Sequence, residues 1–483
     1  MTTAQQLNTA LPEVLRGALG AEVAVNNLRV LTGGASRSTW AFDAVTPDGR
    51  RALILRIGPP DDVHAGMELE ARAQAAAATA GAPVPHVLVA DNSPAALGNP
   101  FLICDEVKGE TIVRRIERQL DEAGRARLLR QCAQALAAIH RADAHDLGLT
   151  HEDQLAQWRG RLDAMGDTTA TFDWAFRWLA AHRPPPSSAL LVHGDYRMGN
   201  LVVDGSGLAA VLDWELLHVG EAYEDLAWFC IRAWRFGAPA SRGAGGLGSI
   251  EEFLCAYEEA SGTTGDRVRF RWWLVLATLR WGVICRYQAQ RHLSGQLRSV
   301  ELAAIGRRVC ETEWDLLNLL DGIQPGDDAG RLRPEEQPGN QNQPGHDAGR
   351  VAGPGWGYPR LRGRAGQSDP AVTDLYGRPT AAELVAAVAE FLETDVREST
   401  SGQVNFHARV AANALRIVER ELLAVSADDV MDALATLGLS NEAQLAAAIR
   451  NGDLDHRADD VTSCLRALVS HRLAVAHPGY QNE

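Results

Sequence analysis

Three polar side chains, Asp195, Asn200 and Asp213, stand beside two short apolar runs of the 483-residue chain. Asn200 follows Asp195 by five residues, and Asp213 follows Asn200 by thirteen. This order of acid, amide and acid matches the catalytic aspartate, metal-binding asparagine and metal-binding aspartate of kinases. The pattern predicts that Asp195 orients a hydroxyl or accepts its proton, and that Asn200 and Asp213 bind Mg²⁺ through oxygen atoms. Three ordinary loop side chains are the alternative interpretation.

The segments around these residues predict short strands that aim the polar groups at one point. The apolar runs 189–192 and 208–212 are typical of buried strands. Residues 204–207, Asp-Gly-Ser-Gly, predict a hairpin turn between them. The three polar residues are therefore expected at strand ends or in the connecting loop.

The motif HGDYRMGN at 193–200, followed by DWE at 213–215, resembles the aminoglycoside phosphotransferase and choline kinase-like family. It is most similar to the branch related to the kinase-like domains fused to acyl-CoA dehydrogenases, and the resemblance covers roughly residues 20 to 320. The resemblance implies an α+β, two-lobed protein-kinase-like fold with an antiparallel N-lobe sheet and a mostly helical C-lobe. It also implies ATP and Mg²⁺ as cofactors and a small molecule as the phosphoryl acceptor.

A glycine-containing turn upstream is a candidate phosphate-binding loop. Gly33, Gly34 and Ser36 lie between two predicted strands. Glycines let backbone N–H groups approach phosphate oxygens closely. The turn lacks a strict G-x-G-x-x-G pattern, so a plain hairpin turn is the alternative.

The chain has a single lysine, Lys108, so the role that kinases give to a strand lysine must fall to another residue. Arg56 occupies the matching strand and can bind phosphate with two N–H groups. Glu70, in a predicted helix at 65–80, is the acid expected to pair with it. An edge-strand arginine reaching solvent and a solvated helix glutamate are the alternatives.

Three further expectations concern other parts of the catalytic region. The resemblance implies that backbone groups around Glu106 and Val107 bind adenine at the hinge between the lobes. Asp225 is expected to cap a helix and to brace the catalytic loop by hydrogen bonds. His140 and His145 are expected at the surface or at a helix end, because no third metal ligand accompanies them.

The predicted domain organisation has four parts. Residues 1–107 form the kinase-like N-lobe and residues 108–321 form the C-lobe with the catalytic and metal sites. Residues 322–375 are rich in Pro and Gly and predict a disordered linker. Residues 376–483 predict a helical accessory domain whose first helix starts with a capping box, Thr380 and Glu383, and which docks on the kinase or dimerises. This part resembles a small uncharacterised helical domain that accompanies these kinases.

Composition excludes several functional classes. A net charge of −15 argues against sequence-independent nucleic-acid binding, which needs a basic surface. Seven scattered cysteines without a CxxC pair argue against a zinc site or a disulfide framework and fit a reducing cytoplasm. The N-terminal sequence does not resemble a signal peptide, and no apolar stretch is long enough to span a bilayer.

The function expected from these features is ATP-dependent phosphorylation of a hydroxyl group on a small molecule. The resembling branch suggests a hydroxyacyl-CoA or a related hydroxy acid as acceptor. An aminoglycoside-type antibiotic kinase and a nucleotide-binding pseudokinase scaffold are the alternatives. Arginines near the cleft would favour the CoA-type ligand, and an acidic cleft would favour the antibiotic.

Overall fold

The computed structural model describes residues 3–31, 37–58, 65–166, 168–321, 378–424 and 426–482. The chain divides by its internal contacts into two units. Unit 1 consists of Met1–Gln157 and His182–Thr278, and unit 2 consists of Trp158–Ala181 and Leu279–Glu483. The chain passes between the units within helices α5 (Gln154–Ala164) and α9 (Arg267–Leu293).

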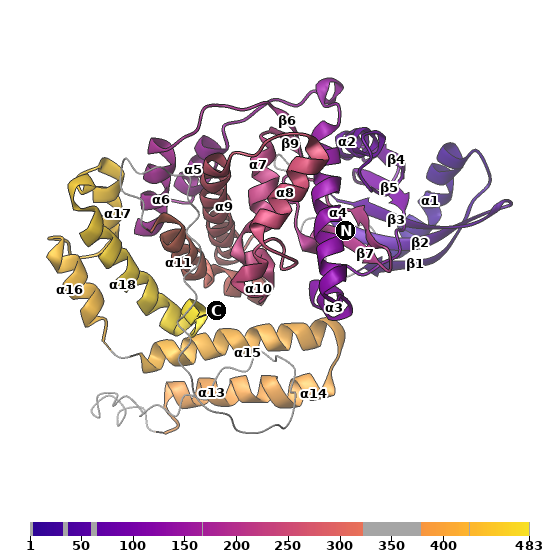
Figure 1. The fold of residues 1–483 in the computed structure, drawn as a ribbon. Helices are drawn as coiled ribbons and strands as arrows, with labels where there is room; N and C mark the ends of the chain where they lie inside the picture. Colours follow the sequence, from indigo (N-terminus) through magenta and orange to yellow (C-terminus); the bar gives the residue numbers. More distant parts are fainter. Residues whose placement is uncertain are drawn as a thin grey trace, which may run out of the picture. The chain divides into compact units, whose positions relative to one another are not determined.

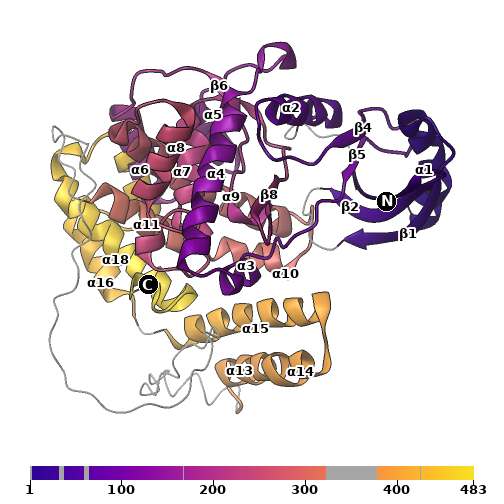
Figure 2. The ribbon, with the colours of Figure 1, turned by 45° about the vertical axis from the view of Figure 1, so that its right-hand side comes forward.

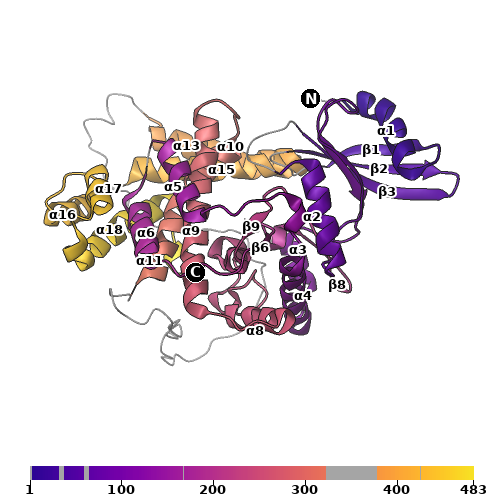
Figure 3. The same ribbon diagram turned by 90° about the horizontal axis from the view of Figure 1, so that it is seen from above.

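Unit 1 begins with an antiparallel sheet of five strands in the order β1-β2-β3-β5-β4 (Figure 1), of which β1, β2 and β3 are also labelled side by side in Figure 3. These strands are β1 (Ala24–Leu31), β2 (Ser38–Thr46), β3 (Gly49–Ile57), β4 (Val87–Asp91) and β5 (Phe101–Asp105). Phe101 and Ile103 share a core with leucines of helix α1 (Ala4–Leu19). Leu102 and Cys104 instead share a core with Met67 of helix α2 (Met67–Thr79). Because alternate residues of a strand face opposite sides, α1 and α2 cover opposite faces of the sheet.

The remainder of unit 1 is mostly helical and contains two small strand pairs. Strand β6 (Leu190–Val192) pairs with β9 (His218–Gly220), and β7 (Leu201–Asp204) forms the predicted hairpin with β8 (Gly207–Val211). The helices are α3 (Val113–Gln119), α4 (Glu122–Arg141), α7 (Ala222–Cys230) and α8 (Ile250–Ser261). Helices α4 and α8 lie side by side (Figure 2), and Arg141 donates a hydrogen bond to the carbonyl of Ala260 at 2.9 Å.

The described residues of unit 2 form helices and connecting loops, without a strand. Its helices include α6 (Ala170–Ala181), α10 (Val300–Gly306), α11 (Val309–Leu320), α13 (Ala381–Phe391), α14 (Arg397–Ser399), α15 (Gly402–Leu423), α16 (Asp428–Thr436), α17 (Glu442–Asn451) and α18 (Ala458–Ala476). Helices α13 and α15 pack against each other (Figure 1). Thr380 and Glu383 form the predicted capping box at the start of α13.

One hydrophobic core joins helices of unit 2 that are far apart in the sequence. Ala170 of α6 and Cys310 and Leu317 of α11 are buried together with residues from α16, α17 and α18. The largest group of partners comes from the C-terminal chain: Val430, Leu434, Leu445, Ile449, Val461, Leu465, Val469 and Leu473. Helices expected in the C-lobe therefore share a core with helices expected in the accessory domain.

The structure bears out the α+β class, with an N-terminal antiparallel sheet and a helical remainder. Residues 298–321 hold two helices, α10 and α11, and the long C-terminal helix α15 begins at Gly402. The predicted linker 322–375 lies outside the described residues. No helix in the described part of the chain combines the length and the apolar character needed to cross a membrane.

Candidate active site

The loop after strand β6 carries the predicted catalytic residue, and its backbone shape depends on Gly194. Gly194 has a φ of +84°, and a side chain there would collide with the carbonyl oxygen of Leu216. Glycine adopts this conformation at little steric cost, so the motif needs Gly between His193 and Asp195. The backbone N–H groups of His193 and Gly194 both donate to the carboxylate of Asp225, at 2.7 and 2.9 Å.

Asp225 is fully buried and braces the catalytic loop as expected. Burial raises the pKa of Asp225, but hydrogen bonding from His140 and the charges and N–H groups around it lower that pKa below its usual value overall. His140 lies in the last turn of α4, one of the two positions expected for it, and is buried 2.7 Å from the hydroxyl of Tyr257 and 3.3 Å from Asp225. The N-cap of helix α7 is Glu221, so the prediction that Asp225 caps this helix is wrong.

Three side chains donate hydrogen bonds to the carboxylate of Asp195. Asn200 donates from Nδ2 at 2.7 Å, Trp228 donates from Nε1 at 2.7 Å, and Arg197 donates from Nε at 3.0 and 3.1 Å. The guanidinium of Arg197 also lies over the ring of Trp234, with its Cζ 4.8 Å from the ring centroid. These contacts fix the orientation of a carboxylate that remains partly accessible, with 15% of its side chain exposed.

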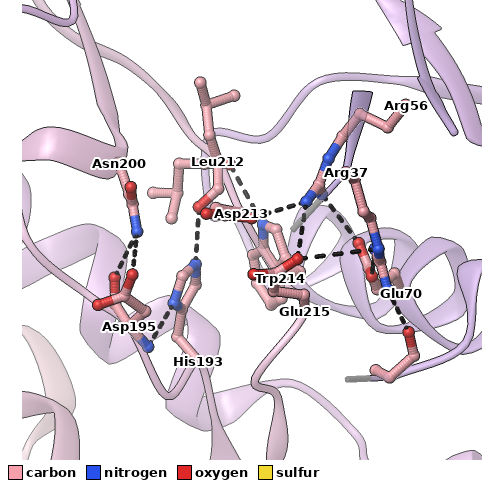
Figure 4. Close-up of polar contacts among 12 residues, drawn as sticks. Arg37, Arg56, Glu70, His193, Asp195, Asn200, Leu212, Asp213, Trp214 and Glu215 are labelled. Atoms are coloured by element: carbon pink, nitrogen blue, oxygen red, sulfur yellow. Dashed lines mark hydrogen bonds and ion pairs between the residues drawn. The ribbon is translucent and has the colours of Figure 1, made fainter. Parts of the chain in front are cut away.

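His193 connects the catalytic loop to the segment before Asp213 (Figure 4). Its Nδ1 accepts the backbone N–H of Asp195 at 3.2 Å, and its Nε2 lies 3.0 Å from the carbonyl of Leu212. A carbonyl only accepts, so Nε2 is the nitrogen that donates, while Nδ1 accepts from Asp195. The N–H of Leu212 in turn donates to the carbonyl of Asn200 at 2.8 Å, so the three predicted residues belong to one connected loop structure.

Asp213 has a φ of +67°, which is uncommon for a residue with a side chain. Residues held in this region occur more often at functional sites than elsewhere. The Asp213 side chain is 34% exposed, and its Oδ1 lies 2.7 Å from Nη2 of Arg56. The backbone therefore presents this carboxylate toward strand β3.

Arg56 links the sheet to the predicted metal ligand. Its Nη1 donates to Glu70 at 3.0 Å, and its Nη2 contacts Asp213 at 2.7 Å and Glu215 at 3.5 Å. Burial lowers the pKa of Arg56, but the nearby carboxylates, led by Asp213, raise that pKa above its usual value overall. Glu70 is fully buried, so the interpretation of Glu70 as a solvated residue disagrees with the structure. Arg56 contacts three carboxylates instead of reaching solvent, so the edge-strand interpretation of Arg56 disagrees as well.

The structure says less about the other residues that are predicted to contact the nucleotide. Gly33, Gly34 and Ser36 lie outside the described residues. Glu106 and Val107 directly follow strand β5, and the N–H of Glu106 donates to the carbonyl of Ala52 at 3.0 Å. That N–H group is already engaged within the sheet, so a hinge contact would use other backbone groups of this segment.

Several residues of the site were not singled out as site residues from the sequence. They are Arg37, Arg197 and Trp228, which contact Glu70 or Asp195, and His140, which contacts Asp225. Arg197 had a local signal, because it lies two residues after Asp195 inside the motif. Arg37 and Trp228 are each 33 residues away from their partners, and no local pattern marks such pairs.

Residues 27–273 match the phosphotransferase enzyme family, and this match spans half of the chain. The chain belongs to this family. Residues 398–480 match a domain of unknown function, DUF6285. The predicted resemblance is thus confirmed for both the N-terminal and the C-terminal parts of this phosphotransferase.

Curated relatives of this phosphotransferase carry the names of acyl-CoA dehydrogenase family members. Acyl-CoA dehydrogenase family member 10 of Mus musculus is 26% identical over 333 residues, which cover 63% of this chain and 31% of the relative. Acyl-CoA dehydrogenase family member 11 of Gallus gallus is 28% identical over 253 residues, which cover 49% of this chain and 31% of the relative. The matched segments thus make up about a third of each relative's length.

A solved structure supports the fold of this phosphotransferase. A protein of Ralstonia eutropha JMP134 that is named for the aminoglycoside phosphotransferases aligns with a TM-score of 0.52 and 24% identity. The alignment covers 64% of this chain and 97% of that protein. The protein-kinase-like fold predicted from the sequence is therefore confirmed.

The side chains of Asn200 and Asp213 fit the Mg²⁺ ion that such a phosphotransferase implies. Asn200 directs its amide N–H groups at the backbone carbonyl and the carboxylate of Asp195, which leaves its amide oxygen as the group able to bind a cation. An amide oxygen and a carboxylate are the hard ligands that Mg²⁺ prefers. Among the described residues, no group of three or more His, Cys, Asp or Glu side chains could hold a metal ion. Mg²⁺ commonly binds only one or two protein groups, and water and nucleotide phosphates supply its other ligands.

Proposed function

We propose that the protein transfers the terminal phosphoryl group of ATP to a hydroxyl group of a small molecule. The observation that carries this proposal is the arrangement of Asp195, Asn200 and Asp213 in one hydrogen-bonded loop structure, with Arg56 paired to Asp213. Membership of the phosphotransferase enzyme family supports the same reaction class. In this class the protein contributes mainly positioning and electrostatic stabilisation.

Each residue has a defined task in this proposal. Asp195 orients the acceptor hydroxyl and receives its proton, because its own carboxylate is held in place by three donors. Arg56 binds phosphate oxygens and is held near them by Glu70. Asn200 and Asp213 hold Mg²⁺, which supplies charge neutralisation for the phosphates when it is bound.

We propose a hydroxyacyl-CoA or a related hydroxy acid as the acceptor. Arg197 places a guanidinium directly against the carboxylate of Asp195, and this position suits an anionic acceptor better than a polycationic antibiotic. The acyl-CoA dehydrogenase names of the curated relatives support the same class of ligand.

The test is a panel of hydroxyacyl-CoA thioesters, free hydroxy acids and aminoglycosides, assayed for ATP-dependent phosphorylation. We expect turnover of at least one acyl acceptor, and we expect Asp195→Ala to reduce that turnover about 100-fold or more. Turnover of aminoglycosides alone would favour the antibiotic kinase. Binding of Mg·ATP without turnover above the Asp195→Ala level on any acceptor would favour the pseudokinase scaffold.

We also propose that the C-terminal helical domain acts while docked on helices α6 and α11, and that the protein works in the cytoplasm. The shared core of Ala170, Cys310 and Leu317 with the C-terminal helices supports docking over a purely tethered domain. Fully buried Glu313 of α11 pairs with Arg472 of α18 at 3.1 Å. Seven free cysteines, of which only Cys255 is exposed, are compatible with a reducing compartment.

A further inference from the structure

Glu70 is contacted by a second arginine, Arg37, which precedes strand β2 and belongs to no predicted site (Figure 4). Arg37 donates from Nη1 to Oε1 of Glu70, while Arg56 donates to Oε2 at 3.0 Å. Each carboxylate oxygen of Glu70 therefore has its own guanidinium. The side chain of Arg37 is only 8% exposed, and that of Glu70 is fully buried.

Arg37 is also fixed to the backbone around the site. Its Nη2 donates to the carbonyl of Ala65 at 2.8 Å, and its Nε lies 3.8 Å from Oε2 of Glu215. The N–H of Ala65 donates to the carbonyl of Glu215 at 2.8 Å. Arg37 is thus held by three groups, namely Glu70, the carbonyl of Ala65 and Glu215, and phosphate binding by Arg56 would displace none of them.

Arg56 differs from Arg37, because one of the residues that it contacts, Asp213, is expected to bind metal. Its Nη2 is on Asp213 and Glu215, whereas its Nη1 is on Glu70. In the proposed function, Arg56 turns Nη2 from Asp213 toward phosphate, and because the guanidinium is rigid and planar, this turn also loosens the contact of Nη1 with Glu70. A buried carboxylate without a cation is strongly unfavourable, so Glu70 would oppose this turn if Arg56 were its only partner.

We propose that Arg37 is a positioning residue of the nucleotide site: it remains the counter-ion of Glu70 and thereby releases Arg56 to bind phosphate. This inference rests on the proposed function, because it assumes that Arg56 binds ATP. It assigns the two arginines different tasks. Arg37 compensates the buried charge in both states, and Arg56 exchanges Asp213 for the nucleotide.

The experiment is a double-mutant cycle with Arg37→Met and Glu70→Gln, read as the ATP dissociation constant with and without Mg²⁺. We expect Arg37→Met alone to weaken ATP binding about tenfold, because Arg56 must then stay on Glu70. In the Glu70→Gln background we expect Arg37→Met to change ATP affinity by less than about twofold, because no buried charge remains to be compensated. Arg37→Lys keeps the charge and should retain most of the affinity.

A matched control is Arg50→Met, which removes an arginine of strand β3 whose side chain is 67% exposed and paired with Asp43 at 2.8 Å. It should leave ATP affinity unchanged. Wild-type ATP affinity in folded Arg37→Met, or an equal loss in both backgrounds, would overturn the inference.

If Arg37→Met does not fold, Arg37→Gln, which keeps N–H donors but no charge, takes its place in the cycle. A loss of ATP affinity that Glu70→Gln abolishes supports the role of Arg37, and wild-type affinity or an equal loss in both backgrounds contradicts it. Failure of the proposed function gives a different result, namely that the wild-type protein does not bind Mg·ATP, or that Asp213→Asn binds it as well as the wild type.

Discussion

Asp225 shows how much of the site depends on one buried charge. It accepts backbone hydrogen bonds from His193 and Gly194 and lies 3.3 Å from His140, all inside a region without exposed surface. Burial raises the pKa of Asp225, and the partners around it lower that pKa below its usual value overall. The ionised carboxylate is therefore the form that the fold requires, and the catalytic loop keeps its shape only while that charge is present.

We expect Asp225→Asn to lower the free energy of unfolding at pH 7 by about 2 to 3 kcal/mol, since charge-assisted hydrogen bonds are lost. A lowered folded pKa gives stability that is complete above the pKa of an unfolded aspartate and is lost as the pH falls through the folded pKa. The difference between variant and wild type should therefore shrink at acidic pH. Urea unfolding at pH 7 and at about pH 3, below the pKa of an unfolded aspartate, checks this.

A matched control is Asp146→Asn, whose side chain is 99% exposed; it should change the free energy of unfolding by less than about 0.5 kcal/mol. If the deficit of Asp225→Asn were the same at both pH values, the buried charge would not be its cause.

Sequence order brings together site residues whose relation is local, while their catalytic and metal-binding roles stay predictions. Asp195 and Asn200 are five residues apart, and they form a hydrogen bond in the structure. Arg56 and Glu70 were matched by their order along the chain and also meet. Trp228 could not be predicted, because its hydrogen bond to Asp195 depends on how helix α7 packs.

Helix α1 illustrates what a pattern predicts at the scale of an element. The helix ends at Gly20, which has a φ of +66° as the C-cap. Its three buried leucines, Leu7, Leu11 and Leu15, recur every four residues and share a core with the sheet. The spacing predicts a helix with one apolar face, but it contains no information about which face of which sheet that helix covers.

We expect Leu11→Ala to lower the free energy of unfolding by about 2 to 5 kcal/mol, because it leaves a cavity between α1 and the sheet. ATP affinity should be unchanged, because helix α2, which carries Glu70, covers the opposite face. Urea unfolding and nucleotide titration measure the two effects. Leu384→Ala, at a helical leucine that is 53% exposed, is the matched control and should cost less than about 1 kcal/mol. A loss of ATP affinity in folded Leu11→Ala would show that α1 is coupled to the nucleotide site.

At the scale of the whole molecule, the domain boundaries predicted from the sequence lie where the composition changes. The contacts in the structure group the chain segments differently. Residues 158–181 and 279–321 fall in the predicted C-lobe, and they belong to the same unit as the C-terminal helices. An apolar face on α11 has the same pattern whether the next lobe helix or a distant domain covers it. The predicted domain boundaries therefore stay a prediction. The shared core determines which segments we expect to unfold together.

Arg472 gives the most direct test of this coupling. It pairs with fully buried Glu313 of α11 at 3.1 Å and also with Glu442 of α17. Burial raises the pKa of Glu313 even though Arg472 opposes the rise. We expect Arg472→Met to lower the free energy of unfolding by about 3 to 5 kcal/mol, because it leaves a buried carboxylate without its cation. Fluorescence of Trp174 and Trp314, which pack on the shared core, reports the transition during urea unfolding.

The matched control is Arg457→Met, which breaks a partly exposed pair with Asp460 in the same unit and should cost less than about 1 kcal/mol. Adding Glu313→Gln to Arg472→Met should recover part of the loss, because the uncompensated charge disappears. If Arg472→Met instead behaved like the control, the ion pair would contribute little, and the C-terminal helices would be held on α11 by the shared core and by other polar contacts, such as that of Tyr480 with Asp315 at 2.8 Å.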